Sequence, residues 1–145
     1  MIAKRSPEPP VSAPTGQVPK KKLEAKFYRT QAGNVPGLDW IKELSRDDRK
    51  LIGEAIRTVE YTWPVPPPLV KKLDDHLWEI RETISNLNEA RLIFTVDSGI
   101  CVLLHGFEKK SRKTPQQDLE TTDNRRKDYN RQKGEATMAP NKRRS

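Results

Sequence analysis

The chain has 145 residues, a usual size for one domain, and carries 28 Lys and Arg against 20 Asp and Glu, a net charge of +8. No apolar run approaches the roughly 18 residues of a membrane span, and the N-terminus lacks the apolar centre of a secretory signal. The single Cys101 cannot form an internal disulfide. We therefore expect a cytoplasmic protein with one modest core, and neither a membrane protein nor a disulfide-stabilised one.

Both ends of the chain have the composition of disordered segments. Residues 1–23 hold five of the twelve prolines and a run of lysines, and residues 132–145 are similarly polar. Such segments bury too little apolar surface to offset the entropy lost on ordering. We predict a disordered basic arm over residues 1–23, one folded domain over 24–131 and a disordered basic tail over 132–145.

The excess positive charge is unevenly placed along the sequence. It lies in residues 1–23 and 105–145, whereas residues 24–104 are slightly acidic. This placement favours a surface that meets a polyanion such as nucleic acid. Solubility alone would also explain it.

The folded region begins with a candidate strand over residues 24–29, followed by two predicted helices. Leu38, Ile41 and Leu44 recur at helical spacing. Ser45, followed three residues later by Asp48, resembles a capping box at the start of the second helix. The apolar face of that helix comprises Leu51, Ile52, Ala55, Ile56 and Val59. The proline-rich run after Trp63 ends helical structure, so an extended connector is expected next.

Three strand-like segments follow, at residues 77–84, 90–96 and 100–107, all rich in β-branched and aromatic residues. Their short connections suit hairpins, which predicts an antiparallel meander joined at its edge by the early strand. Pro115 opens a polar segment that we expect to form a helix lying on the sheet. The predicted fold class is α+β, with two N-terminal helices on a small, mostly antiparallel sheet of about four strands and a C-terminal helix.

Two arginines are predicted to share the sheet face that the first two helices leave open. Alternation along the strands places Arg81 on the face opposite Trp78 and Ile80, and Arg91 on the same face as Arg81. Two guanidinium groups on an open face would make a phosphate site, because they supply fixed charge and forked donors. Pairing with a carboxylate such as Glu79 is the structural alternative.

The segment HGFEKKSRKTP, residues 105–115, places a group of cations directly after an apolar strand. Its composition suits contacts with RNA phosphates, although ordinary basic loops look similar. The cations are Lys109, Lys110, Arg112 and Lys113.

The segment RRKDY, residues 125–129, adds further cations and a tyrosine. The Tyr129 phenol could transfer protons if nearby cations lowered its pKa, and packing on the sheet is the alternative. His105 is the histidine best placed for chemistry, although a lone histidine is more often structural. The sequence offers no metal-ligand cluster, so neither a metal nor another cofactor is expected.

The order of these elements, with the phrases LWEIR, ARLIFTV, LLHGFEKKSRKTP and RRKDY, resembles the RelE/ParE toxin superfamily and specifically its phage-associated HigB-like branch. The resemblance covers about residues 24–131, and the long phrase over residues 103–115 is its most specific part. It implies a compact RelE-like domain that enters the ribosomal A site and cuts messenger RNA without a metal. It also implies a partner, a helix-turn-helix antitoxin that holds the toxin inactive.

In such cleavage the ribose 2′-hydroxyl attacks the adjacent phosphate, so the enzyme must move two protons and stabilise an anionic phosphorane. The resemblance makes Arg81 and Arg91 phosphate clamps, Lys109 a charge-stabilising group and Tyr129 a general base or acid. Asn130 stands where some HigB toxins have a histidine, which leaves Tyr129 or a loop lysine to carry the proton. The expected RNA-binding residues are Lys110, Arg112, Lys113, Arg125, Arg126 and Asp128.

Two other functions remain open from the sequence. The superfamily also contains ParE-type proteins that poison DNA gyrase, so a shared fold does not fix the target. A degenerate toxin that serves as an RNA-binding or regulatory module would also satisfy the charge pattern.

Overall fold

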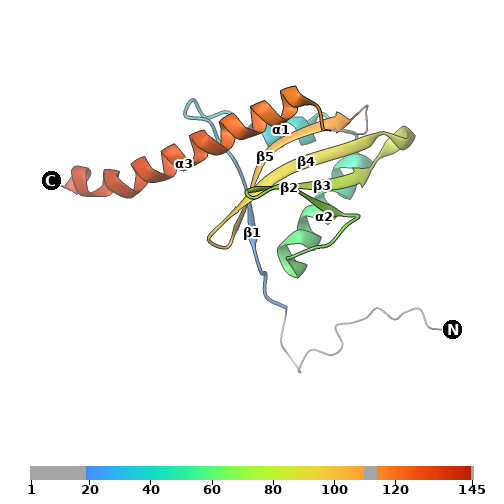
Figure 1. The fold of residues 1–145 in the computed structure, drawn as a ribbon, viewed down its shortest axis with the longest axis horizontal. Helices are drawn as coiled ribbons and strands as arrows, with labels where there is room; N and C mark the ends of the chain where they lie inside the picture. Colours follow the sequence, from blue (N-terminus) through green and yellow to red (C-terminus); the bar gives the residue numbers. More distant parts are fainter. Residues whose placement is uncertain (1–18, 110–113, 145) are drawn as a thin grey trace.

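The computed structural model describes residues 19–109 and 114–144, with side chains as far as residue 136. A five-stranded sheet carries helices α1 and α2 on one face and the long helix α3 on the other (Figure 1). The elements are β1 (Glu24–Phe27), α1 (Pro36–Lys42), α2 (Arg46–Thr62), β2 (Val70–Asp74), β3 (Leu77–Thr83), the 3-10 turn η3 (Ser85–Leu87), β4 (Glu89–Asp97), β5 (Ile100–Lys109) and α3 (Gln116–Arg144).

The sheet has the strand order β1-β5-β4-β3-β2, in which β1 runs parallel to β5 and all other pairs are antiparallel. The predicted α+β class, the two leading helices and the meander with the early strand at its edge are thereby confirmed. The expected number of about four strands is wrong, because Val70–Asp74 forms a fifth strand where an extended connector was expected. Its sequence, VKKLD, carries two adjacent lysines and only two apolar residues, so it lacks the pattern of a buried strand.

The main core lies between the sheet and the helices α1 and α2. Apolar side chains of α2 pack on those of the three central strands, and the fully buried members include Ile52, Val59, Ile80, Leu92, Phe94 and Leu103. One position of the predicted apolar face of α2 differs: Leu51 is 36% exposed and lies outside this core. Period 3.6 places it at the margin of the helix face, where a side chain can remain in solvent.

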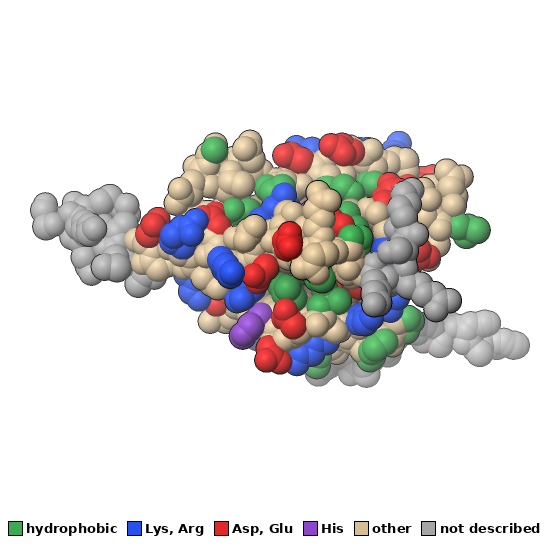
Figure 2. All heavy atoms as spheres, turned by 45° about the horizontal axis from the view of Figure 1, so that its top comes forward, with side chains coloured by type: hydrophobic (Ala, Val, Ile, Leu, Met, Phe, Trp, Pro, Cys, Tyr) green, Lys and Arg blue, Asp and Glu red, His purple; other side chains and the backbone are tan. Residues whose placement is uncertain are grey.

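A second, smaller core lies on the opposite face, under the N-terminal half of α3. Its buried members are Tyr28, Leu77, Ile93, Val102, Leu104 and Phe107. The side of the molecule on which α3 lies shows Lys and Arg side chains interspersed with Asp and Glu (Figure 2). No helix within the described residues is both long and apolar enough to cross a bilayer.

The limits of the folded domain differ from the predicted ones at both ends. Leu23 is 4% exposed and belongs to the main core, so the domain includes residues assigned to the N-terminal arm. Residues 1–18 of that arm lie outside the described residues. At the other end α3 continues to Arg144 through the segment predicted to be disordered. The Gln, Lys, Glu and Ala residues there favour extension of a helix that has already formed, whereas Gly134 and Pro140 oppose it, so composition alone did not predict the helix.

Asp48 links the start of α2 to the turn between β3 and β4. The Ser45 side chain caps α2 by accepting a hydrogen bond from the Asp48 backbone N–H, as the sequence predicted. The Asp48 carboxylate accepts hydrogen bonds from the backbone N–H and the hydroxyl of Ser85, at 3.0 and 2.7 Å. The hydroxyl of Ser85 is the largest cause that lowers the pKa of Asp48 below its ordinary value of 3.8.

We expect part of the acid sensitivity of folding to come from Asp48. A carboxyl whose pKa is lowered in the folded state stabilises it above its unfolded pKa, and that stabilisation disappears as the pH falls below 3.8 and through the folded value. Urea unfolding at pH 6 and pH 3 should therefore show a smaller loss of stability for Asp48→Asn than for the wild type. An equal loss in both proteins would show that other carboxyls dominate.

Candidate functional site

Four cations converge on the sheet face that carries α3, near the hairpin of β3 and β4. Arg81 and Arg91 lie directly opposite each other on neighbouring strands. Lys109 ends β5, and it lies close enough to Arg91, Arg81 and Lys71 for their charges to act on it. We call Lys71, Arg81, Arg91 and Lys109 the cationic cluster. The sequence placed Arg81 and Arg91 on this face correctly, and it missed Lys71 because β2 was not predicted.

Lys109 has an unusual electrostatic environment. Its side chain is 9% exposed. Burial is the largest cause that lowers the pKa of Lys109 below its ordinary value of 10.5, and the charge of Arg91 adds to this effect. Glu79 acts in the opposite direction. A lysine in this state releases its proton more readily than an exposed one, which suits a proton donor.

Arg91 is buried, and the expectation of an exposed arginine is wrong. Its side chain is 4% exposed and its Nη1 donates to Glu89 Oε1 at 3.2 Å and to the Ala90 carbonyl at 3.0 Å. Its Nε lies 3.8 Å from Glu79 Oε1, which is too far for a hydrogen bond. This buried Nε has no hydrogen-bond partner among the described residues. A buried donor without a partner is costly, and the nearby Glu79 carboxylate offsets this cost only in part.

Glu79 is a buried carboxylate beside the cationic cluster. It is 1% exposed, and its Oε2 accepts a hydrogen bond from the Thr114 hydroxyl at 2.9 Å. This contact ties the start of the α3 segment to the centre of the sheet. The alternative of carboxylate pairing is therefore correct for Arg91, whose two carboxylate neighbours are Glu79 and Glu89.

The predicted loop cations cannot be placed relative to the cluster. Lys110, Arg112 and Lys113 lie outside the described residues, which resume at Thr114. Lys109 and Thr114 flank this segment. Thr114 donates a hydrogen bond to Glu79, and the charge of Glu79 acts on Lys109.

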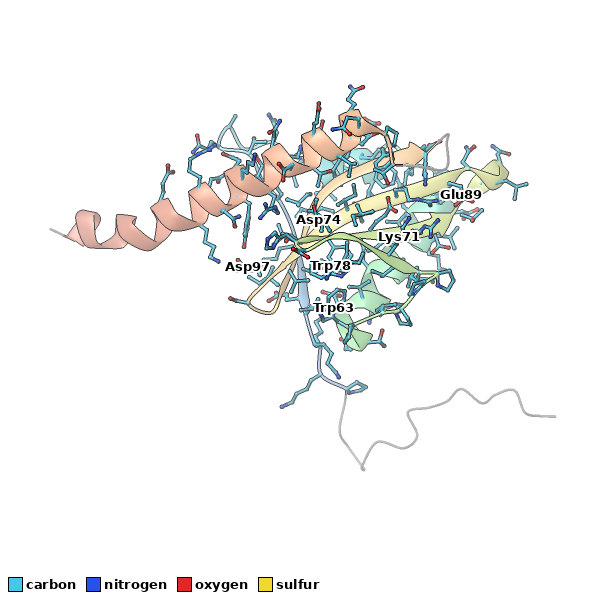
Figure 3. All side chains as sticks on the ribbon, viewed as in Figure 1. Trp63, Lys71, Asp74, Trp78, Glu89 and Asp97 are labelled. Atoms are coloured by element: carbon cyan, nitrogen blue, oxygen red, sulfur yellow. The ribbon has the colours of Figure 1, made fainter. Side chains whose placement is uncertain are left out.

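Tyr129 lies at the opposite end of the sheet from the cationic cluster. Its hydroxyl donates to Asp97 Oδ2 at 2.7 Å. β4 begins at Glu89 and ends at Asp97, and Figure 3 shows these two residues at opposite ends of the strand. Lys71 lies in the same half of the sheet as Glu89. At about 3.3 Å per residue, the two ends of this strand are separated by roughly 25 Å. Tyr129 therefore does not join the cluster.

The expectation that cations lower the pKa of Tyr129 is also wrong. Burial, followed by the hydrogen bond to Asp97, raises the pKa of Tyr129 to about 12. Its ring packs against the second core. The phenol is thus protonated at neutral pH and serves to hold α3 on the end of the sheet.

Asp128 and Arg125, which were expected to bind RNA, also hold α3 in place. Asp128 accepts a hydrogen bond from the Tyr28 hydroxyl at 2.5 Å, and it pairs with Arg131 one turn further along α3. Arg125 Nη1 donates to the Leu104 carbonyl at 2.9 Å.

Arg126 likewise makes an ion pair within α3, 3.7 Å from Asp123. Its Nε is buried and has no partner among the described residues. Arg125 therefore connects α3 with β5, and Arg126 lies against a carboxylate of its own helix.

A family model described as Phage derived protein Gp49-like (DUF891) matches residues 39–127, from α1 into α3. The chain belongs to this family. The Gp49-like family is a RelE-type, toxin-like family, which agrees with the superfamily that the sequence resembles. The match does not distinguish the HigB-like branch. No curated protein is similar enough to count as a relative.

His105 is structural in this Gp49-like protein. Its Nε2 lies 2.6 Å from Asp118 Oδ1 and its Nδ1 lies 3.0 Å from Arg125 Nη1. Because arginine can only donate, Nδ1 is the acceptor and Nε2 carries the hydrogen. Burial is the largest cause that lowers the pKa of His105 below 6.5. Both ring nitrogens are thereby used to connect β5 with α3.

No three His, Cys, Asp or Glu side chains of the described residues are grouped so that they could hold a metal ion. Cys101 is fully buried, and this burial raises the pKa of its thiol to about 12. The described part of the site offers the fixed charge of two arginines, the ammonium groups of Lys71 and Lys109, and the carboxylates of Glu79 and Glu89.

Proposed function

We propose that this Gp49-like protein is the toxin of a type II toxin–antitoxin pair, of the HigB-like kind, and that it cleaves messenger RNA on the ribosome. The observation that carries the proposal is the convergence of Arg81, Arg91 and Lys109 on one sheet face. Membership of a toxin-like family supports it. A helix-turn-helix antitoxin would then cover this face when the toxin is not in use.

In the proposed reaction Arg81 binds the phosphate that is attacked, and the charge of the buried Arg91 supports it. Arg81 is half-buried and can contact the phosphate, and Arg91, fixed by Glu89 directly opposite on the next strand, adds its positive charge from within the sheet. Their charge compensates the additional negative charge of the phosphorane. Because these groups are already in position, they need no rearrangement when the charge develops.

Lys109 is the proposed proton donor. The 2′-oxygen forms a bond to phosphorus and loses its proton to water, while the bond from phosphorus to the 5′-oxygen breaks. The leaving 5′-oxygen takes a proton from the Lys109 ammonium, whose pKa is lowered by burial and by Arg91. The products are a 2′,3′-cyclic phosphate and a 5′-hydroxyl.

The test is induced expression of the wild-type chain with transcript ends mapped and the DNA-damage response recorded in the same cells. Codon-phased cuts ending in cyclic phosphate would support the proposal. Intact transcripts with DNA damage would indicate gyrase poisoning. RNA binding with neither effect would indicate an inactive binding module.

Tyr129→Phe is expected to leave cleavage almost unchanged, because Tyr129 lies far from the cationic cluster. It should lower the free energy of unfolding by about 1 kcal/mol, the usual net contribution of one hydrogen bond, here that to Asp97. Cleavage assays with purified ribosomes and urea unfolding of the same protein would measure both effects. A large loss of cleavage without loss of stability would restore Tyr129 as a catalytic group.

A further inference from the structure

A hollow of about 410 Å³ opens beside the cationic cluster, at the end of the sheet where β3 and β4 form their hairpin. Its volume is within the roughly 300–1,000 Å³ of small-ligand sites. The residues that line it are Pro68, Leu69, Arg81, Glu82, Thr83 and Glu89. Arg81 belongs both to this hollow and to the cluster, and Glu89 binds Arg91, so the hollow adjoins the proposed phosphate position.

The lining determines the chemistry of what can enter. Glu82 and Glu89 both border the hollow beside Arg81, so away from Arg81 its lining favours N–H donors over a phosphate. Pro68 and Leu69 supply apolar surface on the same hollow. A flat group with apolar faces and N–H donors at its edge meets both conditions, and a nucleobase is such a group.

Glu89 is held as a fixed acceptor. The Thr83 hydroxyl donates to its Oε2 at 3.0 Å, and Arg91 Nη1 donates to its Oε1 at 3.2 Å. These two hydrogen bonds, that of Thr83 first, lower the pKa of Glu89 below 4.5, so it is ionised at neutral pH. A carboxylate has about four lone-pair positions, so each oxygen keeps one for a ligand.

The two carboxylate oxygens of Glu89 are adjacent acceptors, and they match a base that presents two adjacent N–H donors. Guanine is the base that presents a ring N–H and an exocyclic amino group side by side on its Watson–Crick edge, and the other bases pair an amino or ring N–H with an acceptor at the adjoining position. We propose that this hollow is a guanine-reading subsite, in which Glu89 selects the nucleotide beside the cleaved phosphate. The inference rests on the proposed ribonuclease function and adds its substrate preference.

The test compares cut sites made by wild type and by Glu89→Gln in a ribosome-containing translation mixture. The wild type should prefer guanine at one fixed position next to the cut. Glu89→Gln replaces one acceptor oxygen with a donor, and it should reduce that preference by about tenfold, the discrimination given by one bidentate base contact. Because Glu89 also binds Arg91, cleavage should slow at every site, and the quantity compared is the ratio of cuts at guanine to cuts elsewhere.

The matched control is Glu120→Gln, the same change at an exposed carboxylate on α3 outside the hollow, which should keep the wild-type preference. Wild-type cleavage with no guanine preference, or an unchanged preference in Glu89→Gln, would overturn the subsite and leave the ribonuclease function standing. Absence of any wild-type cleavage would overturn both proposals.

Discussion

Replacing Arg81 by alanine is expected to lower the rate of messenger RNA cleavage by about 10²- to 10³-fold, the effect of removing one fixed donor to a developing anion. Arg81 is half-buried and lies at the surface of the hollow, so its removal should change the thermal unfolding midpoint little. Single-turnover cleavage on purified ribosomes measures the first effect, and calorimetry measures the second.

Arg57→Ala is the matched control, because Arg57 is an exposed arginine on α2, against the other face of the sheet. It should cleave at the wild-type rate. Arg91→Ala is a poorer test, since it would remove one of the two cations, Arg91 and Lys109, that act on the buried Glu79 and so destabilise the fold. Wild-type cleavage by Arg81→Ala would remove the arginine pair from the mechanism.

The pH dependence of cleavage should identify Lys109. A proton donor must be protonated, so the rate should fall as the pH rises through the lowered pKa of Lys109. Lys109→Arg keeps the charge but titrates only above about pH 12, so it should lose this alkaline fall in rate along with much of the activity. An unchanged alkaline limb in Lys109→Arg would assign the titration to another group.

The sequence predicted the elements whose pattern is locally complete. Segments 77–84, 90–96 and 100–107 carry enough alternating apolar residues to specify a strand, a face and a hairpin partner, and all three form. The strand Val70–Asp74 forms instead because β3 offers it a backbone ladder. The stabilisation comes from pairing with β3, so the residues VKKLD by themselves do not reveal it.

The same distinction explains which part of the site could be predicted. Period two places Arg81 and Arg91 on their common face, but it does not say what covers that face. Arg91 is buried beside Glu79 and Glu89, and Glu79 is in turn bonded to Thr114. The role of Tyr129 depends on where α3 crosses the sheet, which only the tertiary structure determines.

Gly106→Ala is expected to destabilise the protein by about 1–3 kcal/mol or more, the usual cost of overpacking a core. Gly106 lies opposite Leu92 in the sheet, on the face covered by α1. A Cβ at this position would stand 2.2 Å from Cε3 of the Trp40 indole, and a stiff ring can relieve such a contact only by moving the helix. Urea unfolding monitored by tryptophan fluorescence would measure the loss.

Gly53→Ala is the control, because nothing lies within 4 Å of a Cβ built on this glycine in the middle of α2. Alanine there should stabilise the protein by about 0.5–1 kcal/mol through helix propensity. Combining Gly106→Ala with Trp40→Leu should recover part of the lost stability, since the double variant removes the clash. The Trp40 side chain packs α1 against β5. If Gly106→Ala were as stable as Gly53→Ala, this packing would not require a glycine at position 106.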